Sequence, residues 1–169
     1  MARYDVPKAA PAPLRLVQVF VNTVDLAHGL DWLDGPWLRE HGLARASADV
    51  ARAKALRESL RSLLETPLEE ERLALLNRLA AALPLRTCFD RAGRAELEPA
   101  RAGHPLGRLF GIVVSAQRDG SWDRLKACRQ CRWAFYDYSR NRSAQWCSMS
   151  ICGNRAKTRA YRSRRGTGG

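Results

Sequence analysis

Four cysteines near the C-terminal end of this chain have the residue type and spacing of a metal site. Cys128 and Cys131 form a Cys-x2-Cys pair. After fifteen further residues, Cys147 and Cys152 form a Cys-x4-Cys pair. Each pair offers two thiolates from one tight turn, and the spacer allows the turns to meet around a tetrahedral ion. We predict one structural Zn²⁺ held by these four residues. The fifth cysteine, Cys88, fits neither pair, and we expect it to be a small buried hydrophobic residue.

A disulfide framework is the alternative chemistry for clustered cysteines, and the composition argues against it. The chain of 169 residues has five cysteines, an odd number, and is 46% hydrophobic, so it can build a core without covalent cross-links. The apolar stretch from Leu16 to Val21 is too short for export or for crossing a membrane. We therefore expect a cytoplasmic protein whose paired thiols hold metal.

Positive charge is concentrated in the same region. The formal net charge is +12. Residues from 124 onward contain twelve Lys and Arg and one acid, Asp137, which gives +11, whereas residues 1–123 contain seventeen basic and sixteen acidic residues, which gives +1. A basic module attached to a near-neutral body is typical of proteins that bind phosphate groups. The residues that we expect to contact nucleic acid are Arg140, Arg142, Arg155, Lys157, Arg159, Arg162, Arg164 and Arg165.

The segment after Cys152 favours a helix with a basic face. Arg155, Arg159 and Arg162 follow the i, i+4, i+7 spacing, so they share one side of the helix. Phosphate contacts would supply affinity for duplex DNA, and arginines at guanine edges would supply sequence preference. A solvated basic face without a partner is the alternative. For Asn154, next to a metal ligand, we expect a capping or supporting role at the metal site rather than adenine recognition.

The basic region is also rich in aromatic residues, namely Trp133, Phe135, Tyr136, Tyr138 and Trp146. Such residues can stack on the bases of a single strand, or they can form the core of a small module. We expect the core role. An RNA-binding or protein-interaction finger stays open as the alternative function, since charge alone does not separate the two nucleic acids.

Residues 1–120 predict a mainly helical domain with one small β-hairpin. Apolar periodicity indicates helices at about 14–24, at 32–42, from a Ser47 cap to residue 64, from Thr66-Pro67 to before Pro84 and at 106–117; strands are expected at 85–90 and 96–99, and a loop at 28–31.

Residues 121–165 predict a treble-clef-like finger with four cysteine ligands. We expect one strand at 132–138, a second at 144–147, and a closing helix that Ser148 or Ser150 caps and that carries Cys152 near its first turn. Residues 166–169 are expected to be a disordered tail. The overall class is α+β.

Several runs of the basic region resemble a known family, among them Cys131-Arg132-Trp133-Ala134-Phe135-Tyr136-Asp137, Trp146-Cys147-Ser148-Met149 and Cys152-Gly153-Asn154-Arg155. This segment is similar to the CGNR zinc-finger proteins, bacterial proteins regarded as stress-responsive transcriptional regulators and named for the last run. The run Phe20-Val21-Asn22-Thr23-Val24-Asp25 resembles the ABATE domain that usually precedes this finger. The resemblance implies zinc binding, DNA binding, and an N-terminal domain that senses or binds a ligand.

An enzyme is disfavoured by the same residues. Four thiolates close the coordination shell of the ion, and no deaminase motif precedes Cys128. The three histidines, His28, His41 and His104, are scattered, and we expect them to be surface or satisfied loop residues.

We therefore predict a DNA-binding regulator with double-stranded DNA as its partner and no membrane association. A homodimer is one assembly that fits this function. For a small-molecule effector of the N-terminal domain, the candidate pocket residues are Asn22, Asp25 and Trp32.

Overall fold

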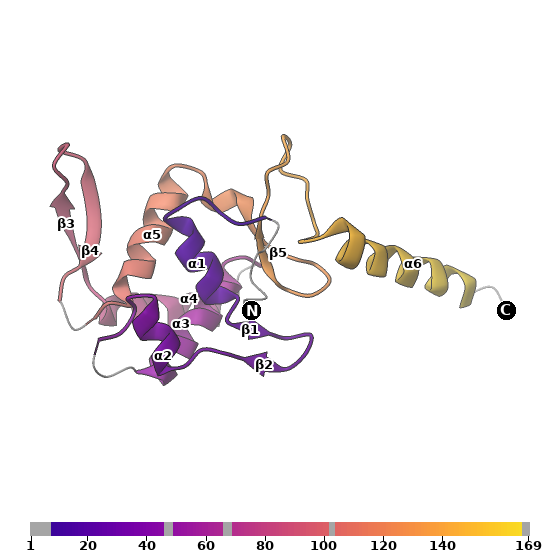
Figure 1. Cartoon of the computed structure of the whole chain (residues 1–169), viewed down its shortest axis with the longest axis horizontal. Coiled ribbons are helices and arrows are strands. Elements are labelled where there is room, and N and C mark those ends of the chain that lie inside the picture. Colours follow the sequence, from indigo (N-terminus) through magenta and orange to yellow (C-terminus); the bar gives the residue numbers. More distant parts are fainter. Residues whose placement is uncertain (1–7, 46–48, 66–68, 102–103, 167–169) are drawn as a thin grey trace.

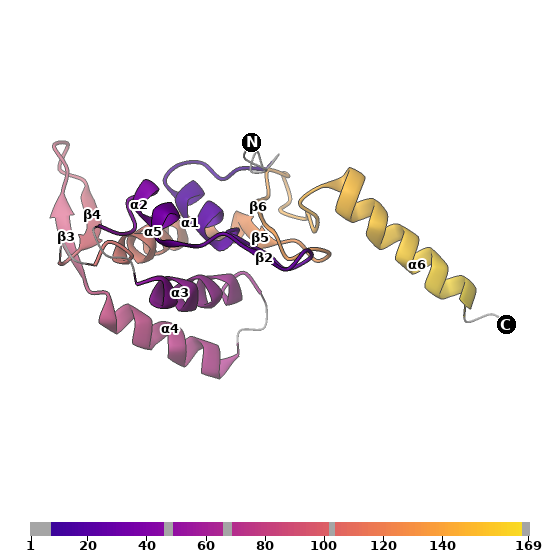
Figure 2. The same cartoon turned by 60° about the horizontal axis from the view of Figure 1, so that its bottom comes forward.

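Helices alternate with short antiparallel hairpins along this chain. The computed structural model describes residues 8–45, 49–65, 69–101 and 104–166. In order, the elements are α1 (Leu14–Val21), β1 (Val24–Asp25), β2 (Leu30–Asp31), α2 (Gly35–Glu40), α3 (Val50–Ser62), α4 (Glu70–Ala82), β3 (Leu85–Phe89), β4 (Ala95–Pro99), α5 (Gly107–Arg118), the 3-10 turn η1 (Trp122–Arg124), β5 (Leu125–Ala127), β6 (Ala134–Tyr136), the π-helical turn η2 (Met149–Gly153) and α6 (Asn154–Gly166). The predicted α+β class is confirmed. Most elements form one body, from which α6 extends as a single helix (Figure 1, Figure 2). Within the described ranges, no helix is long and apolar enough to cross a membrane.

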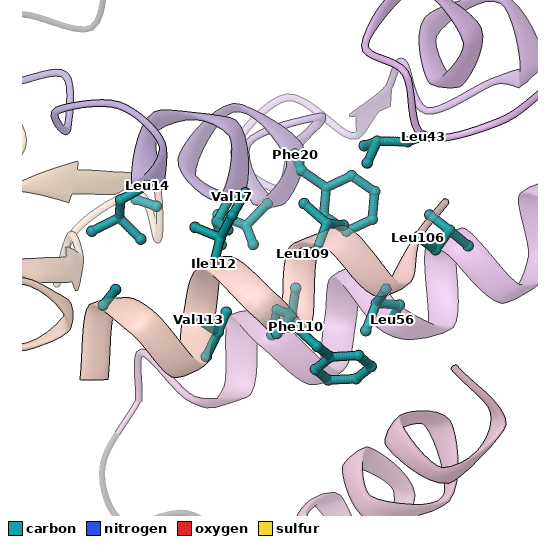
Figure 3. Packing of buried hydrophobic residues seen from close by; sticks show 14 of the residues in the cluster. Leu14, Val17, Phe20, Leu43, Leu56, Leu106, Leu109, Phe110, Ile112 and Val113 are labelled. Atoms are coloured by element: carbon teal, nitrogen blue, oxygen red, sulfur yellow. The ribbon is translucent and has the colours of Figure 1, made fainter. Parts of the chain in front are cut away.

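The core lies where α1, α3 and α5 pack against one another. Val17 and Phe20 of α1, Leu56 of α3 and Leu109 of α5 are fully buried there. Figure 3 shows these side chains meeting between the helices. Because the apolar residues of each helix recur at helical spacing, packing these faces together removes a large apolar area from water. This burial holds the N-terminal body together.

Helix α4 covers α3 from the outside and is more exposed than its leucines suggest. No described residue of α4 is fully buried, and Leu73 and Leu75 remain 43% and 37% exposed. Leu76 and Leu79 pack against the edge of the core. The predicted cap at Thr66-Pro67 and the predicted Ser47 cap of α3 lie outside the described residues. Asp49 caps α3 instead, accepting from the N–H of Arg52 at 2.9 Å.

The hairpin predicted after Pro84 is confirmed. Strands β3 and β4 pair antiparallel from Leu85 opposite Pro99 to Phe89 opposite Ala95. The carboxylate of Asp90 closes the turn by accepting from the N–H groups of Ala92 and Arg94. Helix α5 lies very close to β4. A Cβ added at Gly111 would be only 2.6 Å from the carbonyl oxygen of Leu97. Glycine is therefore required at that crossing.

Helix α1 is shorter than the sequence predicts, and the loop predicted at 28–31 is partly a strand. The helix ends at Val21 because the hydroxyl of Thr23 donates to the carbonyl of Phe20 at 2.7 Å and competes with helical bonding. Val24 and Asp25 then pair with Asp31 and Leu30. This two-residue pairing is too short to leave a periodic signal in the sequence.

The strand predicted at 144–147 is wrong. Strand β6 pairs instead with β5, in the register Leu125–Tyr136 and Ala127–Ala134. The segment 144–147 is irregular in the structure and contacts the hairpin through one backbone bond, from Arg129 to Gln145. The buried carboxylate of Asp137 bends the chain away after β6, since it accepts from the backbone N–H groups of both Ser139 and Ala144.

One ion-pair cluster joins the β1–β2 pair to α3. Asp31 accepts two bonds from the guanidinium of Arg57, at 2.7 and 3.1 Å, and lies 3.0 Å from the ammonium of Lys54. The bonds from Arg57 are the main reason that the pKa of Asp31 lies well below its ordinary value of 3.8. The ionised form therefore stabilises the fold above about pH 4, and this contribution is lost as the pH falls through the lowered pKa.

We predict that Asp31→Asn lowers the free energy of unfolding at pH 7 by about 1–2 kcal/mol, because Arg57 loses its bidentate partner. The value is below that of a fully buried pair, since 31% of the Asp31 side chain is exposed. Urea unfolding between pH 7 and pH 3 should show the difference from the native chain shrinking below pH 4. A pH-independent difference would contradict this assignment. Glu40→Gln, at an exposed position of α2, serves as the control.

Candidate metal centre and basic helix

The four predicted cysteine ligands come together in the structure. Their Sγ atoms all lie within 4.8 Å of one another. The sulfur of Cys131 is 3.7 Å from that of Cys147 and 3.6 Å from that of Cys152, and Cys147 and Cys152 are 3.6 Å apart. Zn–S bonds of about 2.3 Å in a tetrahedron place the sulfurs roughly 3.8 Å apart, whereas a disulfide needs about 2.05 Å. The cluster therefore has the size of a four-thiolate metal site.

The first two ligands lie at the tip of the β5–β6 hairpin. The N–H of Cys128 donates to the carbonyl of Trp133 at 2.9 Å, and the N–H of Arg132 donates to the carbonyl of Cys128 at 2.8 Å. Arg132 adopts a left-handed conformation with φ of 64°, which reverses the chain directly after Cys131. This tight turn brings the sulfurs of Cys128 and Cys131 to the same cluster.

The other two ligands are held by the turn η2, which leads into α6. The hydroxyl of Ser148 accepts from the N–H of Ile151, and the carbonyl of Ser148 accepts from the N–H of Cys152 at 3.0 Å. A Cβ added at Gly153 would lie 2.8 Å from the sulfur of Met149, so glycine allows the turn to close this tightly. Of the two predicted caps, Ser148 is confirmed. It caps η2 and so fixes Cys152 just before the start of α6.

The ionisation of the thiols also favours a cation at the centre. Hydrogen bonds from Cys131 and Cys147 lower the pKa of Cys128 well below its ordinary value. The bond to Cys128, together with burial, raises the pKa of Cys131 to about 12. Hydrogen bonds with Cys128 and Cys131, together with burial, raise the pKa of Cys147. The Cys128 thiolate therefore forms at the expense of those of Cys131 and Cys147, and a divalent ion would relieve this conflict by replacing their protons.

The aromatic residues of the finger mainly form its core. Phe135 is fully buried beside Cys128 and Cys152, and Trp133 and Trp146 pack against them. Tyr136 is buried in the core of the N-terminal body. The predicted core role is confirmed for these residues. Tyr138 differs, since it is 63% exposed and its hydroxyl donates to the carbonyl of Ala9.

Asp137 is a structural residue that the sequence analysis did not assign. It is fully buried, and its carboxylate accepts from Lys126 Nζ at 2.8 Å, from the hydroxyl and N–H of Ser139, and from the N–H of Ala144. Burial alone would raise its pKa, but these bonds outweigh burial and hold the pKa of Asp137 well below the ordinary value. In the sequence, Asp137 is the one acidic residue from position 124 onward, and this signal could have identified it.

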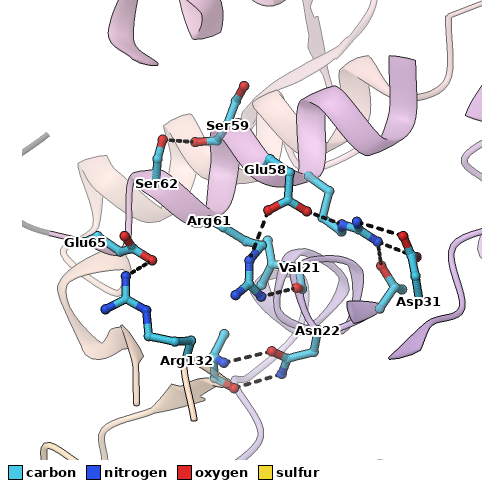
Figure 4. Close-up of polar contacts among 12 residues, drawn as sticks. Val21, Asn22, Asp31, Glu58, Ser59, Arg61, Ser62, Glu65 and Arg132 are labelled. Atoms are coloured by element: carbon cyan, nitrogen blue, oxygen red, sulfur yellow. Dashed lines mark hydrogen bonds and ion pairs between the residues drawn. The ribbon is translucent and has the colours of Figure 1, made fainter. Parts of the chain in front are cut away.

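The finger is bonded directly to the N-terminal body. The side-chain amide of Asn22 accepts from the N–H of Ala134 at 2.8 Å and donates to its carbonyl at 2.9 Å (Figure 4). Gln18 donates to the same carbonyl, and Lys8 donates from Nζ to the carbonyl of Trp146. Arg132 forms an ion pair with Glu65. The junction is therefore built from the segment before α1, from α1 and its end, and from the chain just after α3.

The three residues predicted for an effector pocket each make other contacts in the structure. Asn22 is 2% exposed at the junction with the finger. Asp25 accepts from the ring of His28 at 2.7 Å and from backbone N–H groups of its own turn. The backbone N–H of Trp32 donates to Thr23, and its side chain is half-buried. None of the three lines the shallow groove along α6 or the hollow lined by α5 and β4.

Helix α6 presents its arginines to solvent. Arg155, Arg159 and Arg162 line one shallow groove of about 560 Å³ along the helix, together with Ile151 and Asn154 at its base. Asn154 donates to the carbonyl of Ser150 at 3.0 Å, which is a capping contact. Lys157 is exposed outside this groove.

The remaining predicted nucleic-acid residues lie in two places. Arg140 and Arg142 are exposed in the loop after β6, where Arg142 pairs with Asp123 at 3.2 Å. Arg164 and Arg165 belong to the last turn of α6, and their side chains lie outside the described ones. The basic residues therefore occupy a loop of the finger and the helix that projects from it (Figure 1).

Comparison with protein families finds two matches in this chain. The model of the CGNR zinc finger matches residues 124–165. The model of the ABATE domain, described as "Putative stress-induced transcription regulator", matches residues 14–116. Both matches confirm the resemblance seen in the sequence, and the description points to a regulator rather than an enzyme. No curated protein matches the chain.

We predict that Cys128→Ser abolishes stoichiometric metal binding, because three thiolates and a hydroxyl hold Zn²⁺ or Co²⁺ more weakly than four thiolates do. Titration with Co²⁺ should give the thiolate charge-transfer band of one tetrahedral ion per native chain and little or none in the variant. Cys88→Ser is the matched control, since Cys88 lies on β3 outside the cluster and should bind one ion. Equal loss in both variants would contradict the four-cysteine site.

Proposed function

Because this chain belongs to the ABATE family and carries a CGNR zinc finger, we propose that it regulates transcription by binding double-stranded DNA through α6. The observation that carries this proposal is the row of exposed arginines, Arg155, Arg159 and Arg162, along one side of a projecting helix. The N-terminal body, in this proposal, senses a ligand and adjusts the affinity of the finger for DNA.

The ion that we propose for the four-cysteine site is a single structural Zn²⁺. Four thiolates leave no open coordination position, which suits a structural ion and not a catalytic one. When bound, zinc supplies four strong bonds that link the β5–β6 tip to the start of α6. The residues that hold it are Cys128, Cys131, Cys147 and Cys152.

The dimensions of α6 support a groove-binding role. The helix has 13 residues, so it is roughly 20 Å long. A helix about 10–12 Å in diameter fits the major groove of B-DNA, which is about 12 Å wide. Among the described elements, α6 contacts mainly η2, the turn directly before it, so a duplex can approach the helix from most sides. Phosphate contacts would also offset the repulsion between arginines at i, i+4 spacing.

The positions of the aromatic residues favour duplex DNA over single-stranded RNA. Stacking on unpaired bases needs exposed rings, but Phe135 and Tyr136 are buried, and Trp133 and Trp146 pack around the cysteines. Tyr138 is exposed, yet its ring packs edge-on against Tyr136 at 4.8 Å. The described part of the finger therefore offers no row of free aromatic faces.

We predict that Arg155→Ala weakens binding to duplex DNA roughly fivefold at low salt and lowers the slope of log affinity against log salt by about 1, since one phosphate contact is lost. Fluorescence anisotropy on genomic fragments selected with the native chain would measure both quantities. Arg78→Ala, which removes one exposed charge from α4, should change neither. Both variants should retain one metal ion.

Unchanged affinity in Arg155→Ala would remove α6 from the contact surface. A native chain that prefers single-stranded RNA to duplex DNA at equal salt would support the RNA-binding alternative. Binding to neither nucleic acid, in a metal-loaded chain, would favour a protein-interaction finger.

A further inference from the structure

A large hollow lies in the N-terminal body, away from the metal site. It has a volume of about 1370 Å³ and is lined by α5, by β4, by the segment 42–45 and by the residues before α1. In Figure 1, β4 and α5 lie toward one end of the molecule, and α6 extends from the other. The hollow therefore does not belong to the basic surface of the finger.

The lining of this hollow is strongly basic. Five arginines and two glutamates line it, which gives a net charge of +3. Two of the arginines are paired, Arg86 with Glu98 at 3.4 Å and Arg94 with Asp90 at 2.8 Å. The other three are Arg45, Arg101 and Arg108, and the guanidinium groups of these three make no hydrogen bond or ion pair with another described residue. Unpaired guanidinium groups that share one concave surface repel one another unless an anion lies between them.

One of these arginines, Arg108, lies against the backbone at the edge of the hollow. Gly42 has a left-handed φ of 67°, and a Cβ added there would lie 3.8 Å from Nη1 of Arg108. The guanidinium of Arg108 therefore lies over the backbone of Gly42. One turn further along α5, Gly111 and Ile112 form the wall, and the close contact of Gly111 with Leu97 sets the distance between α5 and β4.

The rest of the lining includes apolar groups. Pro13, Leu97, Pro99 and Ile112 contribute to the walls between the charged residues. Small-molecule sites combine apolar walls with a few polar groups that orient the ligand. An inorganic anion would use only the arginines, whereas an anion with an organic body would use both kinds of surface.

We propose that this hollow binds an organic anion through phosphate or carboxylate groups, with Arg45, Arg101 and Arg108 as the oxyanion-binding residues. Guanidinium groups bind both kinds of oxyanion through paired N–H donors. This inference rests on the proposed ligand-sensing role of the N-terminal body. It places the ligand apart from Asn22, Asp25 and Trp32, the residues selected from the sequence.

Calorimetry with the full metal-loaded chain tests this site, using ADP as the phosphate probe and citrate as the carboxylate probe. We expect one of them to bind with a dissociation constant below about 1 mM. Arg108→Gln should weaken that binding roughly tenfold. Arg118→Gln is the matched control, because it removes the same charge from the exposed C-terminal end of the same helix and does not line the hollow.

Equal weakening by Arg108→Gln and Arg118→Gln would mean attraction by overall charge alone and would overturn the site. Binding of neither probe below about 1 mM would also overturn it. Measuring affinity for duplex DNA distinguishes failure of this site from failure of the proposed function. If Arg108→Gln weakens DNA binding as much as Arg155→Ala does, the hollow is a nucleic-acid surface and this inference is wrong. If the probe binds but leaves DNA affinity unchanged, the site stands and the proposed sensing role fails.

Discussion

The cage of four sulfur atoms is the constraint on which the finger depends. Its own apolar core is very small, with Phe135 as the one fully buried aromatic residue among the described finger residues that pack on the cysteines. So little buried area cannot offset the conformational entropy of ordering about forty residues. In the proposed zinc-bound chain, metal–thiolate bonds supply the difference, and Cys152 links them to α6. The direction of the basic helix is therefore set by one ligand and the tight turn around Gly153.

The second constraint is the junction between finger and body. Because Asn22 bonds to both backbone groups of Ala134, and Gln18 shares its carbonyl, β6 is bonded to α1 almost as a neighbouring strand would be. Buried amide–backbone bonds of this kind are costly to break, since water cannot replace the lost partner. The finger is thus not a module on a free linker, and movement of α1 would carry β6 with it.

Local chemistry could be read from the sequence, and long-range pairing could not. The cysteine spacing, the β3–β4 hairpin and the basic face of α6 follow from neighbours within a few turns of chain. The partner of β6 was missed because Leu125–Ala127 is only three residues long. Asn22 was selected from the sequence as a candidate pocket residue, but nothing local shows that its amide bonds to Ala134, 112 residues away. Arginines at 45, 101 and 108 line one hollow without any common spacing.

The positions of the hollow and the junction give the body a physical route between its two ends. Helix α5 lines the hollow with Arg108, Gly111 and Ile112, and it packs along α1, which carries Asn22 to the finger. Packing contacts alone do not couple the hollow to the finger. A ligand shifts a conformational equilibrium only by the difference between its affinities for the two conformations. Here the two arrangements would differ in the spacing of α5 from β4, which the contact of Gly111 with Leu97 limits on one side. An anion that draws Arg108 of α5 toward Arg101 after β4 acts on that spacing, and α1 is the element through which the finger would respond.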